Sequence, residues 1–89
     1  MNSHVTDDFI ACFHKLSEKI QRTAQKNYKL WKQNSHHPGL DFKKVHTTKP
    51  IYSVRISIGW RALGIMEGDN IIWFWIGPHP EYDRILKQL

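Results

Sequence analysis

The sequence has 89 residues, a net charge of +5 and a single cysteine, Cys12. A chain of this length supports one domain over residues 1–89, because it cannot bury enough surface to form two separate cores. The lone cysteine excludes an internal disulfide, no apolar run approaches the roughly 20 residues that span a bilayer, and the N-terminus has no pattern of a secretion signal, so we expect a soluble cytoplasmic protein without membrane association.

The first predicted element is helical and runs from Thr6 to Gln33. Thr6 is a suitable N-cap, and Asp7 and Asp8 would then place their carboxylates at the positive end of the helix dipole. Apolar residues follow at spacings of three and four, as on the buried side of a helix. They are Phe9, Phe13, Leu16, Ile20, Ala24, Tyr28 and Trp31. The pattern fits one long helix and equally well two helices with a break near Ser17.

Basic residues recur along the same region with the same rhythm, and we call them the basic stripe. They are Lys15, Lys19, Arg22, Lys26 and Lys29. Because Lys15 and Lys19 directly precede the apolar positions Leu16 and Ile20, we expect the stripe about 100° around the helix from the buried side. From Lys15 to Lys49, nine basic residues stand against two acidic ones, whereas the rest of the chain from Pro50 is neutral. Such a charge excess is typical of a surface that binds RNA or another polyanion, although a solvated helix face has the same composition.

The second half of the sequence has the alternation of β-strands. A turn over residues 34–39 ends the helical region, and the hydrophobic period then changes to two. The predicted strands cover residues 52–58, 60–66 and 71–76. Gly59 allows a tight reversal between the first two, and a four-residue turn separates the last two, which together predict an antiparallel meander. Pro80 could open a short C-terminal helical turn through Leu86.

The third predicted strand is apolar on both faces. Its residues read Ile71-Ile72-Trp73-Phe74-Trp75-Ile76, which is the pattern of a strand covered on both sides. A chain this short has few helices to supply a second cover. We therefore expect a partner protein, or a second copy in a homodimer, to cover the exposed aromatic side.

Strand register predicts that four polar side chains meet at one end of the sheet. A reversal around Gly59 places Arg55 opposite or diagonal to Arg61. A second reversal with Met66 facing Ile71 pairs Arg61 with Ile76, three residues before His79. Tyr82 follows His79 by three residues, so the two rings would share one side of a helical turn.

The four residues Arg55, Arg61, His79 and Tyr82 suit phosphodiester chemistry. An arginine fork binds phosphate in bidentate fashion, and a histidine can move a proton near neutral pH. Tyr82 could stack on a base or assist proton transfer. The alternative to a catalytic role is a structural one. The arginines could pair with Glu81 and Asp83, and His79 could serve solely to cap the turn at Pro80.

Two other features carry less functional weight. His36, His37 and His46 lack the spacing of a zinc site, so we expect no metal and no other cofactor. Cys12 lies among apolar helical positions and is expected to be a small buried side chain, not a nucleophile.

The order of the elements resembles the RelE/ParE superfamily of small bacterial toxins over residues 9–86. The segments that carry this resemblance are Tyr28-Lys29-Leu30-Trp31, Leu40-Asp41-Phe42-Lys43-Lys44-Val45, Tyr52-Ser53-Val54-Arg55-Ile56, Trp60-Arg61-Ala62-Leu63-Gly64 and Trp75-Ile76-Gly77-Pro78-His79-Pro80-Glu81-Tyr82-Asp83. The resemblance implies an α+β fold, with an N-terminal helical hairpin packed on a twisted antiparallel sheet and a short C-terminal helical turn. It favours two helices over one.

The resemblance also implies a toxin of a type II toxin–antitoxin system, held in check by a cognate antitoxin. In the nuclease branch of the superfamily, a metal-independent endoribonuclease cleaves mRNA on the ribosome, and Arg55, Arg61, His79 and Tyr82 match its catalytic positions. Lys43 and Lys44 match its RNA-binding lysines. The alternatives are a non-enzymatic inhibitor of DNA gyrase and a degenerate toxin-like binding module, because fold alone does not choose an activity.

Overall fold

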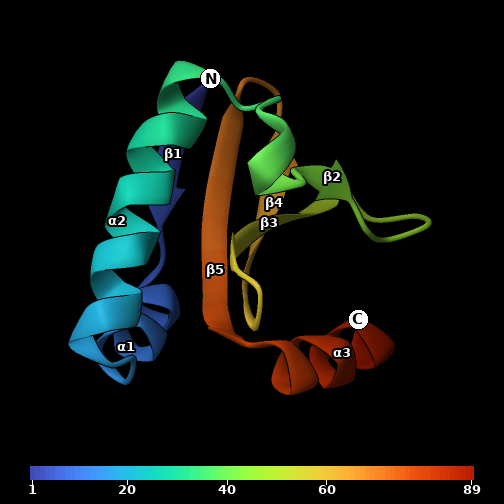
Figure 1. The fold of residues 1–89 in the computed structure, drawn as a ribbon. Helices are drawn as coiled ribbons and strands as arrows, with labels where there is room; N and C mark the ends of the chain where they lie inside the picture. The colour runs from blue at the N-terminus through green and yellow to red at the C-terminus, as the bar shows by residue number, and fades with distance from the viewer.

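The computed structural model describes all 89 residues, which form three α-helices, a short 3-10 helix and a five-stranded sheet (Figure 1). The elements in chain order are β1 (Asn2–Val5), α1 (Asp7–His14), α2 (Glu18–Gln33), η1 (Pro38–Leu40), β2 (Lys43–Lys44), β3 (Ile51–Ser57), β4 (Trp60–Glu67), β5 (Asn70–Pro78) and α3 (His79–Gln88). The predicted α+β class is confirmed. No helix is both long enough and apolar enough to cross a membrane.

The helical region is divided at Ser17, as the resemblance implied. The Thr6 side chain accepts from Phe9 N at the start of α1, and the Ser17 side chain accepts from Ile20 N at the start of α2. The Gln21 amide donates to the carbonyls of Phe13 and Leu16, each at 3.1 Å. These bonds satisfy backbone groups that a helix end leaves without a partner, so they stabilise the break.

The sheet has the strand order β1-β5-β4-β3-β2. Strands β3, β4 and β5 form the predicted antiparallel meander, with Met66 facing Ile71 as expected. Strand β1 adds a parallel edge beside β5, which makes the sheet mixed, and this strand was not predicted. Its four residues are mostly exposed, so they lack the alternation that marks a half-buried strand.

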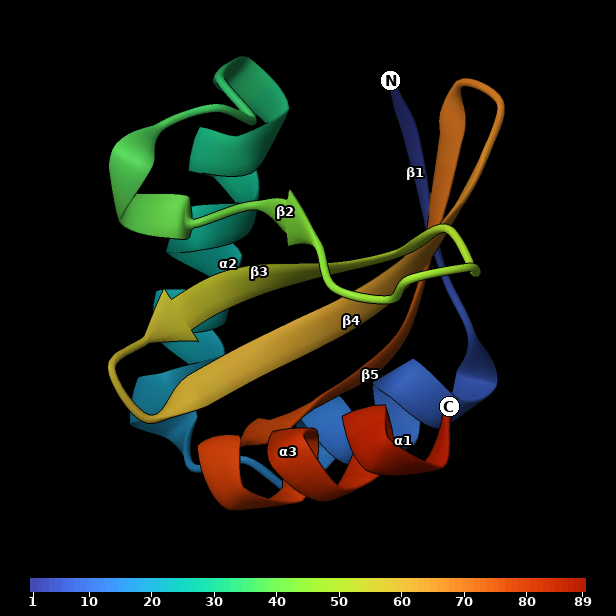
Figure 2. The same cartoon turned by 90° about the vertical axis from the view of Figure 1, so that its right-hand side faces the viewer.

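Helices cover both faces of the sheet. Helices α1 and α2 lie on one face, where Ala24, Trp31 and Trp73 join the main core. Helix α3 lies on the other face, where Tyr82 packs with Ile51 and Leu63 in a second core (Figure 2). We call these the α2 face and the α3 face.

The expectation of an uncovered aromatic side on β5 needs correction. Trp73 is only 4% exposed and lies under α1 and α2. Trp75 is half-buried on the other face, with its ring centroid 6.5 Å from that of Tyr82. Helix α3 is longer than the helical turn we predicted and supplies most of the second cover. A partner is therefore not needed at these two tryptophans.

Candidate functional site

Arg55 and Arg61 lie side by side on the α3 face. They are directly paired across β3 and β4, as predicted. Residues that face each other across two strands share one face of the sheet, and alternation puts Arg61 on the same face as Leu63, which packs against Tyr82. Both arginine side chains are half-buried. The register therefore brings two positive charges together at one end of the α3 face.

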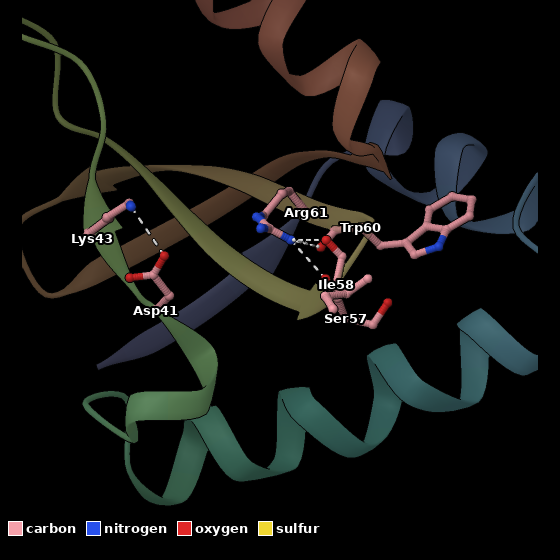
Figure 3. A network of polar contacts seen from close by, with 6 residues as sticks. All are labelled: Asp41, Lys43, Ser57, Ile58, Trp60 and Arg61. Carbon is pink, nitrogen blue, oxygen red and sulfur yellow. Dashed lines mark hydrogen bonds and ion pairs between the residues drawn. The ribbon is translucent and has the colours of Figure 1, made fainter.

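The two arginines differ in how they are held. The Nη1 atom of Arg61 donates to the carbonyls of Ser57 at 2.8 Å, Trp60 at 2.9 Å and Ile58 at 3.4 Å (Figure 3). These bonds fix Arg61 to the turn between β3 and β4 and use one of its nitrogens. The side chain of Arg55 forms no hydrogen bond or ion pair within the chain. One guanidinium is oriented in advance, and the other is free.

The acidic residues near the site do not neutralise the arginines. Glu81 pairs with Arg84 at 3.9 Å, and Asp83 pairs with His79 at 3.2 Å. The alternative that Glu81 and Asp83 form ion pairs with Arg55 and Arg61 is therefore wrong. The arginine pair keeps its charge available for an external anion.

His79 joins this end of the sheet, although its predicted register was wrong by one residue. Arg61 faces Gly77 instead of Ile76, because Phe74 forms a β-bulge opposite the step from Leu63 to Gly64. The backbone N–H of His79 donates to Gly59 O at 2.8 Å, which links the start of α3 to the turn beside the arginines.

Asp83 is a contributor to the site that the sequence interpretation missed. Its carboxylate lies 3.2 Å from Nδ1 of His79, one helical turn away. We had considered Asp83 only as a partner of the arginines, but its spacing of four residues from His79 is the signal that could have revealed the pair. A carboxylate at Nδ1 favours a proton on that nitrogen, which leaves Nε2 as the atom that can accept or donate in a reaction.

Tyr82 lies beside His79 as expected, but it belongs to the core. The two ring centroids are 5.4 Å apart in an edge-on arrangement. Tyr82 is only 7% exposed, because it packs between Trp75 and the second core. Of the two roles that we considered for Tyr82, stacking on a nucleotide base is incompatible with this burial, and assistance of proton transfer stays a prediction. Tyr82 instead supports the imidazole of His79.

The two lysines of β2 point to opposite faces of the sheet. Lys43 faces Ser53 and so shares the α3 face with Arg55, whereas Lys44 faces Tyr52 on the α2 face. Lys43 also pairs with Asp41 at 3.1 Å (Figure 3). Only Lys43 extends the positive surface of the arginine pair.

The basic stripe lies away from the arginines. Its members on α2 are all exposed, and Lys15 caps the end of α1. Our expected offset of 100° was wrong: Lys26 is two residues from Ala24, which is about 200° around a helix, so the stripe points away from the sheet. The sheet therefore separates the stripe from Arg55 and Arg61, and the two do not form one continuous surface.

The histidines outside the site have local structural roles. Nδ1 of His37 accepts from Gly39 N, and Nδ1 of His46 accepts from Thr48 N and Lys49 N. The chain has no group of three side chains arranged to hold a metal ion.

Comparison with known proteins indicates one family. A family model described as the ParE-like toxin domain matches residues 18–84. The fold is similar to that in the RelB–RelE antitoxin–toxin complex from Methanococcus jannaschii, with a TM-score of 0.71, 20% identity and coverage of 91% of this chain and 96% of that one. It is also similar to the RelBE2 complex from Mycobacterium tuberculosis, with a TM-score of 0.70, 12% identity and coverage of 88% and 96%. A third similar structure is the YoeB dimer from Staphylococcus aureus, with a TM-score of 0.67, 14% identity and coverage of 89% and 97%. No curated protein sequence matches the chain.

Proposed function

The chain belongs to the ParE-like toxin family of toxin–antitoxin systems, and from this premise we propose that it is an endoribonuclease that cleaves mRNA on the ribosome. The observation that carries the proposal is the pair Arg55 and Arg61 beside His79, at one end of the α3 face. Two unneutralised guanidinium groups suit a phosphate, and an imidazole with a free Nε2 suits proton transfer.

In the proposed reaction, the 2′-oxygen of a ribose attacks the adjacent phosphorus. His79 Nε2 accepts the hydroxyl proton, and the bond from phosphorus to the 5′-oxygen breaks. The leaving oxygen takes a proton from solvent, and the products are a 2′,3′-cyclic phosphate and a free 5′-hydroxyl. Arg55 and Arg61 stabilise the charge on the non-bridging oxygens. Asp83 stabilises the imidazolium that forms on His79, and no step calls for a metal.

We further propose that the basic stripe, with Lys43 and Lys44, binds RNA of the ribosome and that an antitoxin restrains the toxin. These basic side chains are exposed, and all except Lys43 are free of ion pairs, so they are suited to phosphate groups. The antitoxin is supported by the similar toxins of Methanococcus jannaschii and Mycobacterium tuberculosis, which were each solved in complex with an antitoxin.

The decisive test is cleavage of a defined mRNA on purified ribosomes, with the 5′ ends of the fragments mapped. We expect His79→Ala to slow cleavage by about 10²- to 10⁴-fold, the usual contribution of a positioned acid or base, while ribosome binding stays intact. Equal rates for the two proteins would refute the role of His79.

Inhibition of DNA gyrase is the second candidate, and the exposure of the basic stripe on the opposite side of the sheet favours it. In that case the wild type would inhibit supercoiling without cutting mRNA, and His79→Ala would keep full activity. Effects on neither mRNA nor supercoiling, with no harm to growth on expression, would point to a toxin-like binding module.

A further inference from the structure

Gly77 completes a row of three residues across the sheet, at the arginine end of the α3 face. Arg55 faces Arg61 across β3 and β4, and Arg61 faces Gly77 across β4 and β5. Neighbouring strands are about 4.8 Å apart, so Gly77 is directly adjacent to the arginine pair. The proposed reaction uses the two arginines and gives no role to this third position.

The indole of Trp75 occupies the space above Gly77. A Cβ atom at Gly77 would lie 2.6 Å from Cζ2 of Trp75, 3.1 Å from Cη2 and 3.2 Å from Cε2, and the first of these distances is closer than non-bonded carbon atoms approach. The two residues are two positions apart on β5, so both belong to the α3 face. Glycine is therefore required for the ring to lie against the strand beside Arg61.

Trp73 and Trp75 belong to the same strand but differ in what holds them. Trp73 is 4% exposed, and its indole N–H donates to the Ser3 hydroxyl at 3.1 Å. Trp75 keeps part of its surface open, and its indole N–H has no acceptor in the chain. This N–H reaches solvent, because the only buried side-chain polar atom without a partner is Nε1 of Trp31. Trp73 is a core residue, whereas Trp75 has an unused donor.

The chain supports the Trp75 ring without enclosing it. Tyr82 of α3 lies against it, with the ring centroids 6.5 Å apart and the planes inclined by 30°. No cation of the chain lies over the indole, because the one cation–π contact joins Lys32 to Tyr28. Arg61 is turned instead to the carbonyls of the β3–β4 turn. The open part of the indole is therefore available to an external planar group.

An aromatic ring beside a phosphate site suits a nucleotide. Proteins that bind single-stranded RNA stack the bases on aromatic side chains, and one ribose separates each base from its phosphate. A phosphate held by Arg55 and Arg61 would therefore bring a base to a neighbouring position on the same face. Trp75 is the partly open aromatic residue at that position.

The place of His79 indicates which nucleotide this is. The rings of His79 and Trp75 both contact Tyr82, so the imidazole and the indole lie on the β5 side of the arginine pair. In the proposed reaction, His79 accepts the proton of the attacking 2′-hydroxyl. The 2′-oxygen and the base are attached to neighbouring carbon atoms of the ribose, so the base of this same nucleotide lies nearest to the indole.

We propose that Trp75 binds, by stacking, the base of the nucleotide on the 5′ side of the cleaved bond. The inference rests on the proposed function, because the phosphate beside this base is the one that Arg55 and Arg61 hold. A purine covers more of an indole than a pyrimidine does, so the site prefers adenine or guanine. The indole N–H can donate to an acceptor of the nucleotide.

Nuclear magnetic resonance of the full-length protein with RNA that cannot be cleaved tests this inference. The probes are 2′-O-methyl tetranucleotides of adenosine and of uridine, in which the attacking hydroxyl is blocked. We expect the adenosine oligomer to shift the indole N–H signal of Trp75 and not that of Trp73. It should also bind about threefold to tenfold more tightly than the uridine oligomer. An unshifted Trp75 signal, or equal affinities for the two oligomers, would overturn the inference.

Substitutions of Trp75 separate stacking from packing. Trp75→Phe keeps an aromatic ring and should keep the preference for adenosine. Trp75→Leu keeps apolar bulk without a ring, so its affinity for the adenosine oligomer should fall by about tenfold and the preference should disappear. Circular dichroism checks that both variants are folded. A folded Trp75→Leu variant that still prefers adenosine would contradict the assignment.

Two glycine substitutions leave every tryptophan in place and serve as a matched pair. Gly77→Ala displaces the Trp75 indole, whereas a Cβ atom at Gly64 would lie 2.8 Å from Cε3 of Trp73 and so disturbs the α2 face instead. Both variants should lower the free energy of unfolding, but only Gly77→Ala should reduce the preference for adenosine. An equal loss of preference in the two variants would show that the effect is merely structural and would overturn the inference.

The binding assay and the cleavage assay fail separately. A Trp75 shift without cleavage of mRNA on ribosomes would refute the proposed reaction and support the base site. Cleavage that His79→Ala abolishes, together with an unshifted Trp75 signal, would support the proposed reaction and refute the base site.

Discussion

The two positively charged regions of this molecule are built in different ways. On the α3 face, Arg55 and Arg61 are placed by strand register, and one of them is held by three backbone carbonyls. On the α2 face, the basic stripe consists of exposed side chains on the outer side of a helix, with no ion pairs of their own. A pair of charges placed by strand register suits the transition state of a reaction, whereas an exposed row of charges suits attraction of a polyanion. Mutations in the two regions should therefore have effects of different kinds.

Of the two positively charged regions, the arginine pair is where we expect substitutions to reduce the cleavage rate most. Arg61→Ala should slow mRNA cleavage by about 10²- to 10³-fold, as does removal of a donor to a developing oxyanion elsewhere. Arg61→Lys keeps the charge and loses the fork, so similar losses from both variants would indicate bidentate phosphate binding. Single-turnover cleavage on ribosomes measures this.

Arg55→Ala is the matched control for the structural role of Arg61. Only Arg61 binds backbone carbonyls, so Arg61→Ala should also cost about 1–2 kcal/mol of unfolding free energy, whereas Arg55→Ala should cost little. Urea unfolding separates the two. If neither substitution slows cleavage, the proposed phosphate site is wrong.

Substitutions in the basic stripe should change the affinity for RNA and not the rate of cleavage. Binding of RNA or ribosomes should weaken as the salt concentration rises. In a plot of log affinity against log salt concentration, each phosphate contact to a single strand adds about 0.7 to the steepness of the slope. Lys26→Gln together with Lys29→Gln should lower the slope by about 1.4 and leave the cleavage rate at saturation unchanged. An affinity that does not depend on salt would remove the stripe from RNA binding.

A smaller effect is expected at Asp83, which acts through His79. Asp83→Asn should reduce the cleavage rate by about tenfold, in the range for a residue that orients a catalytic side chain. An unchanged cleavage rate would remove Asp83 from the site.

The smallest effect is expected at Tyr82. Tyr82→Phe keeps the ring against Trp75 and His79, so the cleavage rate should stay within about twofold of the wild type. A decrease in the cleavage rate of about 10²-fold or more would indicate that the Tyr82 hydroxyl takes part in proton transfer. The same cleavage assay decides between these outcomes.

Local patterns in the sequence were sufficient for the arginine site. Alternation in β3 and the glycine turn after it determine that Arg55 faces Arg61, because hairpin register follows from turn position. The same local signals gave the break at Ser17, through its capping side chain, once the family resemblance favoured it.

Features that depend on distant contacts could not be predicted. The bulge at Phe74 has no sequence signal, since it arises where β5 packs against α3 and α2 at once. Strand β1 depends on β5, which lies almost seventy residues further along the chain, as its pairing of Asn2 with Asn70 shows.

The parallel pairing of the first strand with the last one has a consequence for the order of folding. During synthesis, β1 leaves the ribosome before β5 and has no strand to pair with until β5 has emerged. Its closure of so long a loop carries a large entropic cost, and contacts of this kind form late and slowly. The nascent chain therefore completes its sheet only after residues 70–78 have been made. A product that terminates before β5 would lack both the strand that pairs with β1 and helix α3, which covers the other face of the sheet.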